Sequence, residues 1–177
     1  STLFSEEFYA QVRRYLKDDG LLVQWIQVYE INPNLVSTVF RALGPNFSDY
    51  VIHVSSAGDM IVVAAKTGRV PAMRGDFTAF PGLMKDLQLT GFKSLADVER
   101  TRVAGRETLE PLFLRLADVA NSDYFPILDQ HAARSRFKQE AATDLQMIGK
   151  NMVPILPFIE GDRRIRRESL RGDYPIA

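Results

Sequence analysis

The sequence lacks several features on which common kinds of chemistry depend. Its 177 residues contain no cysteine, which excludes disulfide bonds, thiolate catalysis and cysteine-ligated metal centres. No two glycines stand in a G-x-G spacing, so the phosphate-binding loop of a dinucleotide site has no candidate. A G-x-S-x-G motif is also missing, which leaves an α/β-hydrolase reaction without a nucleophile to name.

Neither one sign of charge nor a long apolar segment dominates the chain. Acidic and basic residues number 22 each, so no net field would attract nucleic acid, and we expect no nucleic-acid partner. The apolar run near the end, Val153 to Ile159, is broken by two prolines and is far shorter than the ~20 residues that cross a bilayer. We therefore predict no membrane span, and the 46% hydrophobic content is sufficient for one packed core.

The first 66 residues alternate between helix-like and strand-like patterns. Apolar residues at helical spacing mark two amphipathic helices, and β-rich runs mark three strands. In chain order the predicted elements are a helix over 4–18, a strand over 21–29, a helix over 32–44, and a hairpin of strands 49–55 and 59–66. This order predicts the closing part of a mostly parallel α/β sheet whose last strand inserts antiparallel. Because the strand over 21–29 is largely apolar on both faces, we expect it inside a covered sheet.

Beyond residue 69 the patterns become helical. Ser94 is a candidate N-cap, and Pro111 suits the first turn of a helix. The predicted helices cover 80–89, 95–103, 109–119 and 132–150. The sequence thus divides into an α/β part over 1–70, a helical extension over 71–160 and an arginine-rich tail over 161–177. Since acidic residues interrupt the tail, we favour a solvated end over a surface that binds phosphates or lipid headgroups.

Several segments, taken in order, carry a resemblance to a known family. They are Leu3-Phe4-Ser5-Glu6-Glu7-Phe8-Tyr9, then Gln24-Trp25, Asn32-Pro33, Gly58-Asp59-Met60-Ile61-Val62-Val63 and Asn121-Ser122-Asp123-Tyr124-Phe125-Pro126-Ile127-Leu128-Asp129. Together they resemble the spermidine synthase family, the polyamine aminopropyltransferases, and most closely its bacterial membrane-fused members. The resemblance covers roughly residues 1 to 137.

The resemblance implies the C-terminal half of a Rossmann-like sheet, similar to that of class I methyltransferases, ending in an antiparallel hairpin. A complete parent protein of this family takes decarboxylated S-adenosylmethionine as co-substrate and a polyamine as acceptor. The family's nucleotide loop and catalytic aspartate precede the segment that matches Leu3 to Tyr9, so we expect no cofactor in this chain. The polyamine-binding tyrosine of the family's last hairpin has no counterpart in Ser55 to Gly58, which weakens the expectation of ordinary putrescine binding.

Three functions remain open on this basis. The first is a fragment of a spermidine synthase-like aminopropyltransferase, inactive alone, in the cytoplasm or on the cytoplasmic face of a membrane-fused parent. Its partner would be the missing N-terminal half or a second copy, joined through the exposed sheet edge. The second is a non-catalytic oligomerisation or interaction domain, and the weakest is part of an S-adenosylmethionine-dependent methyltransferase.

Gln24 is the one substrate-binding candidate. It lies mid-strand among apolar residues, and the resemblance places it beside the polyamine pocket. The alternative, which we favour, is a buried amide satisfied by a neighbouring backbone group. Trp25 and Tyr29 lie on the opposite face of the strand, where we expect core packing. His53 and His131 are too far apart in sequence to suggest a zinc site, and a satisfied core or edge histidine is the simpler interpretation of His53.

A second candidate lies in the Asn121 segment. Asp123 and Asp129 are spaced as a carboxylate pair for acid–base chemistry. The alternative, which we favour, is that the polar residues from Asn121 to Asp123 cap and turn the chain while Pro126 ends a helix.

Overall fold

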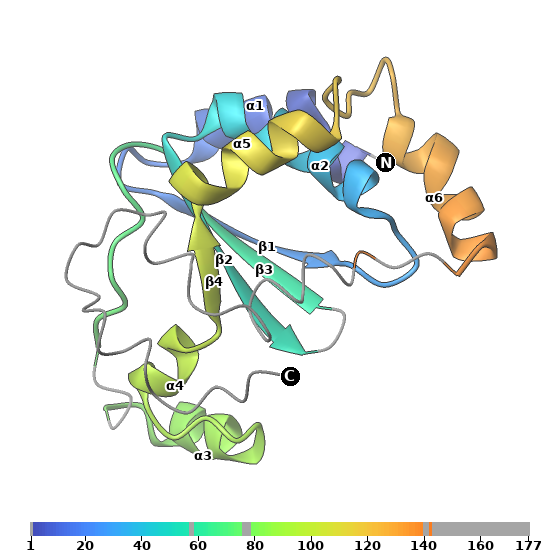
Figure 1. Ribbon diagram of the computed structural model, residues 1–177. Coiled ribbons are helices and arrows are strands. Elements are labelled where there is room, and N and C mark those ends of the chain that lie inside the picture. Colours follow the sequence, from blue (N-terminus) through green and yellow to red (C-terminus); the bar gives the residue numbers. More distant parts are fainter. Residues whose placement is uncertain (1, 57–58, 76–78, 140–141, 143–177) are drawn as a thin grey trace, which may run out of the picture.

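The computed structural model describes residues 2–56, 59–75, 79–139 and 142. Four strands form one sheet at its centre, in the spatial order β1-β3-β2-β4 (Figure 1). Their bounds are Leu21–Gln27 for β1, Asp49–Ser56 for β2, Asp59–Ala65 for β3 and Arg102–Gly105 for β4.

Helices cover one face of this sheet. Helices α1 (Glu6–Tyr15), α2 (Pro33–Leu43) and α5 (Arg106–Leu116) lie together over it. Helices α3 and α4 lie apart from them, below the sheet in the view of Figure 1. The remaining elements are η1 (Thr2–Phe4), η2 (Gly44–Asn46), α3 (Pro81–Leu89), α4 (Leu95–Glu99) and α6 (Ile127–Phe137). No helix in these described ranges is both long and apolar enough to cross a membrane.

The predicted helix starts are confirmed by side-chain caps. The oxygen of Ser5 accepts a hydrogen bond from the Phe8 amide at 3.2 Å, and that of Asn32 accepts from the Leu35 amide at 3.0 Å. Ser94 caps α4 through the Asp97 amide. Each cap satisfies an amide that would otherwise lack a partner in the first helical turn.

The hairpin is confirmed, but the expected Rossmann-like sheet is wrong. Strand β3 pairs antiparallel with both β1 and β2, and β4 pairs antiparallel with β2, so the described sheet contains no parallel pair. The physical reason lies in the insertion of β3. Strands β1 and β2 run in the same direction, as the α2 connection between them suggested, but β3 separates them and neither pairs with the other.

Strand β1 also departs from its prediction, because it lies at the edge of the sheet and not inside it. Its even-numbered residues face the helices, with Ile26 buried. On the opposite face the side chains of Val23 and Trp25 are 63% and 52% exposed, and Tyr29 just beyond the strand is exposed as well. The expected core packing of Trp25 and Tyr29 is therefore wrong for the described residues, since the helices of the sheet layer cover its other face only.

The core lies between the sheet and helices α2 and α5. The rings of Phe40 on α2 and Phe113 on α5 stack with centroids 4.2 Å apart, and Phe40 also contacts Tyr50 of β2. Below them the sheet contributes buried residues from each strand, namely Ile26, Tyr50, Ile52, Met60, Val62, Ala64 and Ala104. A hydrogen bond from the Tyr9 hydroxyl of α1 to Gln24 joins α1 to β1.

Three predictions in the second half need correction. The helix expected over 95–103 ends at Glu99, and the chain then forms β4, which pairs with β2. Helix α5 begins at Arg106, earlier than expected, so Pro111 lies beyond its first turn. Helix α6 begins at Ile127 directly after Pro126, which therefore precedes a helix and does not end one. Of the helix predicted over 132–150, the part up to Phe137 belongs to α6, which ends there. Residues 140–141 and 143–150 of that prediction and the tail over 161–177 lie outside the described residues.

Candidate functional site

A pocket lies at the carboxyl end of β1, with a volume of about 220 Å³. We call it the β1-end pocket. Two aromatic residues, two acidic residues and several apolar residues line it. The residues that line it are Phe4, Trp25, Ile26, Gln27, Glu30, Ile31, Val39, Leu128, Asp129 and Ala132.

The chain leaves β1 through a strained residue at this pocket. Glu30 has a φ of 59°, in the left-handed region that residues with a side chain seldom occupy. Its carboxylate forms an ion pair with Arg136 of α6 at 3.2 Å. Next to it, the indole N–H of Trp25 donates to the carboxylate of Asp59 at 2.9 Å. The strain and these two contacts fix an acidic and an aromatic side chain at the same strand end.

Gln24 lies beside this pocket, on the helical face of β1. Its amide oxygen accepts a hydrogen bond from the Tyr9 hydroxyl at 2.7 Å, and its amide nitrogen donates to the Leu3 carbonyl at 2.8 Å. Burial raises the pKa of Tyr9, so this phenol stays protonated and remains a donor. These contacts engage both ends of the Gln24 amide, and they join the segment over 3–9 to β1.

The Asn121 segment docks onto the same N-terminal segment. The side chain of Asn121, which is 1% exposed, donates to the Phe4 carbonyl at 3.0 Å and accepts from the Leu128 amide at 3.0 Å. Its backbone amide donates to Thr38 of α2. Asn121 thus joins η1, α2 and α6, and it positions Phe4 and Asp129 at the two sides of the β1-end pocket.

A carboxylate in α1 fixes the turn that follows Asn121. Glu7 accepts hydrogen bonds from the Ser122 hydroxyl at 2.7 Å and from the Asp123 amide at 2.9 Å. The Asp123 backbone amide and the Ser122 hydroxyl together lower the pKa of Glu7 below its ordinary value. The turning role expected for this segment is confirmed. The side chains of Asp123 and Asp129 are both exposed, Asp123 in the turn and Asp129 in the first turn of α6.

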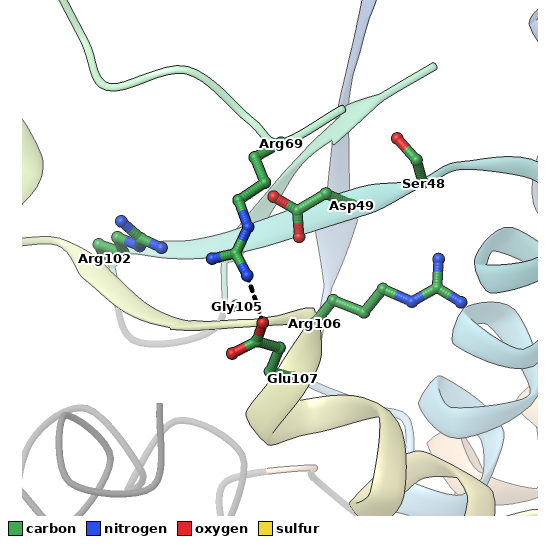
Figure 2. A pocket seen from close by; sticks show the side chains of 7 residues that line it. All are labelled: Ser48, Asp49, Arg69, Arg102, Gly105, Arg106 and Glu107. Carbon is green, nitrogen blue, oxygen red and sulfur yellow. Dashed lines mark hydrogen bonds and ion pairs between the residues drawn. The ribbon is translucent and has the colours of Figure 1, made fainter. Parts of the chain in front are cut away.

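A second pocket, shown in Figure 2, is charged and smaller, with a volume of about 180 Å³. Arg69 forms an ion pair with Glu107 at 2.6 Å, and Arg106 forms one with Glu110 at 2.6 Å while also donating to the Phe47 carbonyl. Two of its arginines are therefore neutralised by carboxylates of α5. The arrangement indicates a structural charge cluster that connects α5 to the sheet.

The two histidines lie in different environments. His53 is buried on β2, where its Nδ1 lies 3.0 Å from the Thr101 hydroxyl, while His131 is exposed on α6. Burial lowers the pKa of His53, so its ring is neutral near pH 7. The interpretation of His53 as a satisfied buried histidine is confirmed.

Sequence reasoning did not identify Phe4 and Glu30 as members of a site. The strain at Glu30 arises where β1 turns toward α2, and no residue pattern signals it. Phe4 lies in the helical stripe of the first segment, and only its position beside Asn121 brings it to the carboxyl end of β1. No protein-family model, curated protein or solved structure matches the chain.

The β1-end pocket is the described region with the clearest chemistry. Aromatic faces beside carboxylates attract organic cations, through cation–π contacts and ion pairing, and methylene groups between two charges pack against apolar walls. The pocket has no nucleophile paired with a base. Its lining residues offer charge pairing together with aromatic and apolar contacts.

Proposed function

We propose that this chain is part of a spermidine synthase-like aminopropyltransferase domain and supplies the wall that holds the polyamine. We further propose that it transfers no aminopropyl group by itself, because its sequence has no G-x-G loop for a nucleotide donor. The observation that carries the proposal is the β1-end pocket, where Glu30 and Asp129 flank Phe4 and Trp25.

The composition of the pocket supports this function. Its acidic residues offer carboxylates to ammonium groups, and its apolar residues offer a surface to the methylenes between them. A polyamine placed there would pair its ammonium groups with Asp129 and with Glu30, which also forms an ion pair with Arg136, while its methylenes lie on the apolar lining.

The segments that resemble the family also meet around the pocket. Gln24 bonds to the segment over 3–9, and the segment over 121–129 bonds to both Phe4 and Glu7. Under this proposal Gln24 acts by positioning η1 and Phe4 next to the polyamine. A direct contact of Gln24 with the amine would require the amide to exchange one of its two present partners.

Calorimetric titration of spermidine into the chain tests the proposal. We expect saturable binding that weakens at least about tenfold in Glu30→Gln and in Asp129→Asn, because each removes a charged partner of an ammonium group. Asp86→Asn, which removes an exposed carboxylate from α3, serves as the matched control and should bind as the wild type does. Equal binding by all four proteins would contradict the assignment of the pocket.

A parallel titration tests the inactivity of the chain alone. Methylthioadenosine and decarboxylated S-adenosylmethionine should give no binding heat at micromolar concentration. Micromolar binding of either nucleoside would overturn the claim, whatever the result with spermidine.

One observation favours a second candidate, a non-catalytic interaction domain. Strand β1 pairs only with β3 among the described residues, and it carries exposed Val23 and Trp25 and no charged residue. An unpaired uncharged edge is prone to pair with another strand. Sedimentation equilibrium distinguishes this candidate: a dimer that Val23→Lys converts to a folded monomer supports pairing between copies, and a monomeric wild type argues against it.

A further inference from the structure

A third, larger cavity lies on the open face of the sheet, near the amino end of β1. Its volume is about 400 Å³. It shares no lining residue with the β1-end pocket, and we call it the open-face cleft. It is lined by Leu21, Val51, His53, Val63, Val70, Pro71, Ala72, Met73, Arg74, Glu99 and Arg102.

The floor of the cleft is apolar and belongs to three strands. Val51 of β2 lies opposite Val63 of β3 in the sheet register, and Leu21 of β1 completes the floor. His53 continues the floor on β2 and is only 6% exposed. Since burial lowers its pKa and keeps the ring uncharged near pH 7, the floor carries no net charge.

One wall of the cleft is a loop held at two points. The Val70 amide donates to the carboxylate of Asp49 at 2.8 Å, and the Met73 amide donates to that of Glu99 at 3.4 Å. These bonds hold residues 70–73 across the open face and leave the space beneath them. The cleft is thus bounded by backbone that side chains of the sheet and α4 fix in place.

The rim carries two exposed arginines. Arg74 ends the wall and Arg102 begins β4, and both line the cleft. Glu99 adds one carboxylate, which already accepts the Met73 amide. The formal charges of these three rim residues therefore sum to one positive unit, and the floor below them is apolar and uncharged.

We propose that the open-face cleft binds a monocarboxylate with an apolar chain. The carboxylate lies between Arg74 and Arg102, and the chain extends over Val51 and Val63. Arginine recognises carboxylates through paired N–H donors, which suits this head group. A phosphorylated sugar or nucleotide would leave the apolar floor unused, and an organic amine would be repelled at the rim.

Octanoate is a suitable probe, and titration of the ¹⁵N-labelled full chain by NMR is the measurement. We expect saturable shifts of backbone amides in β2, in β3 and in residues 70–74. Octylamine and 1-octanol share the chain but lack the carboxylate, so each should bind at least about tenfold more weakly.

Three variants locate the site. Arg102 lines both the cleft and the pocket in Figure 2, whereas the exposed Arg69 lines that pocket alone. Arg102→Gln should therefore weaken octanoate at least about tenfold, and Arg69→Gln should leave the affinity unchanged. Val63→Phe fills the cleft from its half-buried position and should abolish binding. Circular dichroism and thermal melting of each variant establish that it is folded before its affinity is compared.

Several outcomes would overturn the proposal. They are the absence of saturable octanoate binding by the full chain, equal binding of octylamine, or an unchanged affinity in folded Arg102→Gln. The result is independent of the spermidine titration, because the two probes have opposite charges and the variants belong to different cavities.

Discussion

The two faces of the sheet differ in how completely the described residues cover them. On the helical face, Gln24 and Asn121 each have partners at both ends of the amide, and Val62 is fully buried. On the open face, a loop covers the half around His53, and Val23 and Trp25 remain exposed on β1. Among the described residues, the helical face is therefore packed, whereas half of the open face is exposed.

This difference also explains two residues whose environment is the reverse of what their polarity suggests. Asn121 is polar but buried, and it is structural because its side chain bonds to backbone groups of two other segments. Apolar residues such as Trp25 lie in a strand-like run and are exposed. Substitutions on the two faces should therefore have opposite consequences for stability and for binding.

The largest effect is expected from Asn121→Ala. It removes a side chain that satisfies the Phe4 carbonyl and the Leu128 amide, and leaves both without that partner. Unsatisfied buried groups of this kind cost about 1–3 kcal/mol each, so the free energy of unfolding should fall by about 3 kcal/mol. Urea denaturation measures the change. Asn34→Ala, at an exposed position of α2, should shift it by under about 0.5 kcal/mol.

A matched pair of substitutions compares the two faces within one strand. Val62→Ala on the helical face should lower the free energy of unfolding by about 2 kcal/mol, through lost burial and the cavity that remains. Val63→Ala, one residue on and half-buried on the open face, should lower it by less than half as much. Urea denaturation of the two variants side by side is the measurement. Equal losses would mean that the open face is as fully packed as the helical face.

Glu30→Gly should raise stability and reduce amine binding. Glycine adopts a φ of 59° without the steric cost that Glu30 incurs, so the free energy of unfolding should rise by about 1 kcal/mol. The ion pair with the exposed Arg136 contributes little to oppose this gain. Thermal melting and spermidine titration on the same sample test the prediction. A variant that loses stability would show that the pocket imposes no strain at Glu30.

The smallest effect concerns the pH dependence of the helical face. The folded-state pKa of Glu7 is lowered from its ordinary value of 4.5, so its carboxylate stabilises the fold above that pH. This stabilisation is lost as the pH falls through the lower folded-state pKa. Melting temperatures measured from pH 6 to pH 3 should fall less steeply in Glu7→Gln than in the wild type. Glu6→Gln, whose carboxylate is not bonded to the Ser122 turn, should keep the wild-type slope.

Local signals in the sequence predicted the helix starts and the hairpin. They did not predict the order of the strands in the sheet, which depends on contacts between distant segments. Ser5, Asn32 and Ser94 mark helix starts because capping depends on residues three apart. Strand β4 has four residues and no distinctive pattern, and it forms because β2 offers an open edge. The exposure of Trp25 depends on which face the helices cover, and a strand apolar on both faces gives no information about that.

The site was predicted only in part for the same reason. Gln24 was identified from its polar character within an apolar strand, and its partners, Tyr9 and Leu3, lie next to it only after folding. Glu30 and Phe4 come to the β1-end pocket through a backbone turn and through Asn121. Such positions depend on contacts between segments more than 100 residues apart in the case of Asn121 and Phe4, which a residue pattern does not encode.

The most direct test of the account uses Trp25, the single tryptophan of the chain and a member of the β1-end pocket. Its indole N–H gives one resolved NMR signal, which can be followed as spermidine is added. The account predicts a saturable shift of this signal in the wild type and a much weaker response in folded Glu30→Gln. An unchanged signal at millimolar spermidine, or an equal shift with the uncharged 1,8-octanediol, would contradict the claim that this strand end binds polyamines.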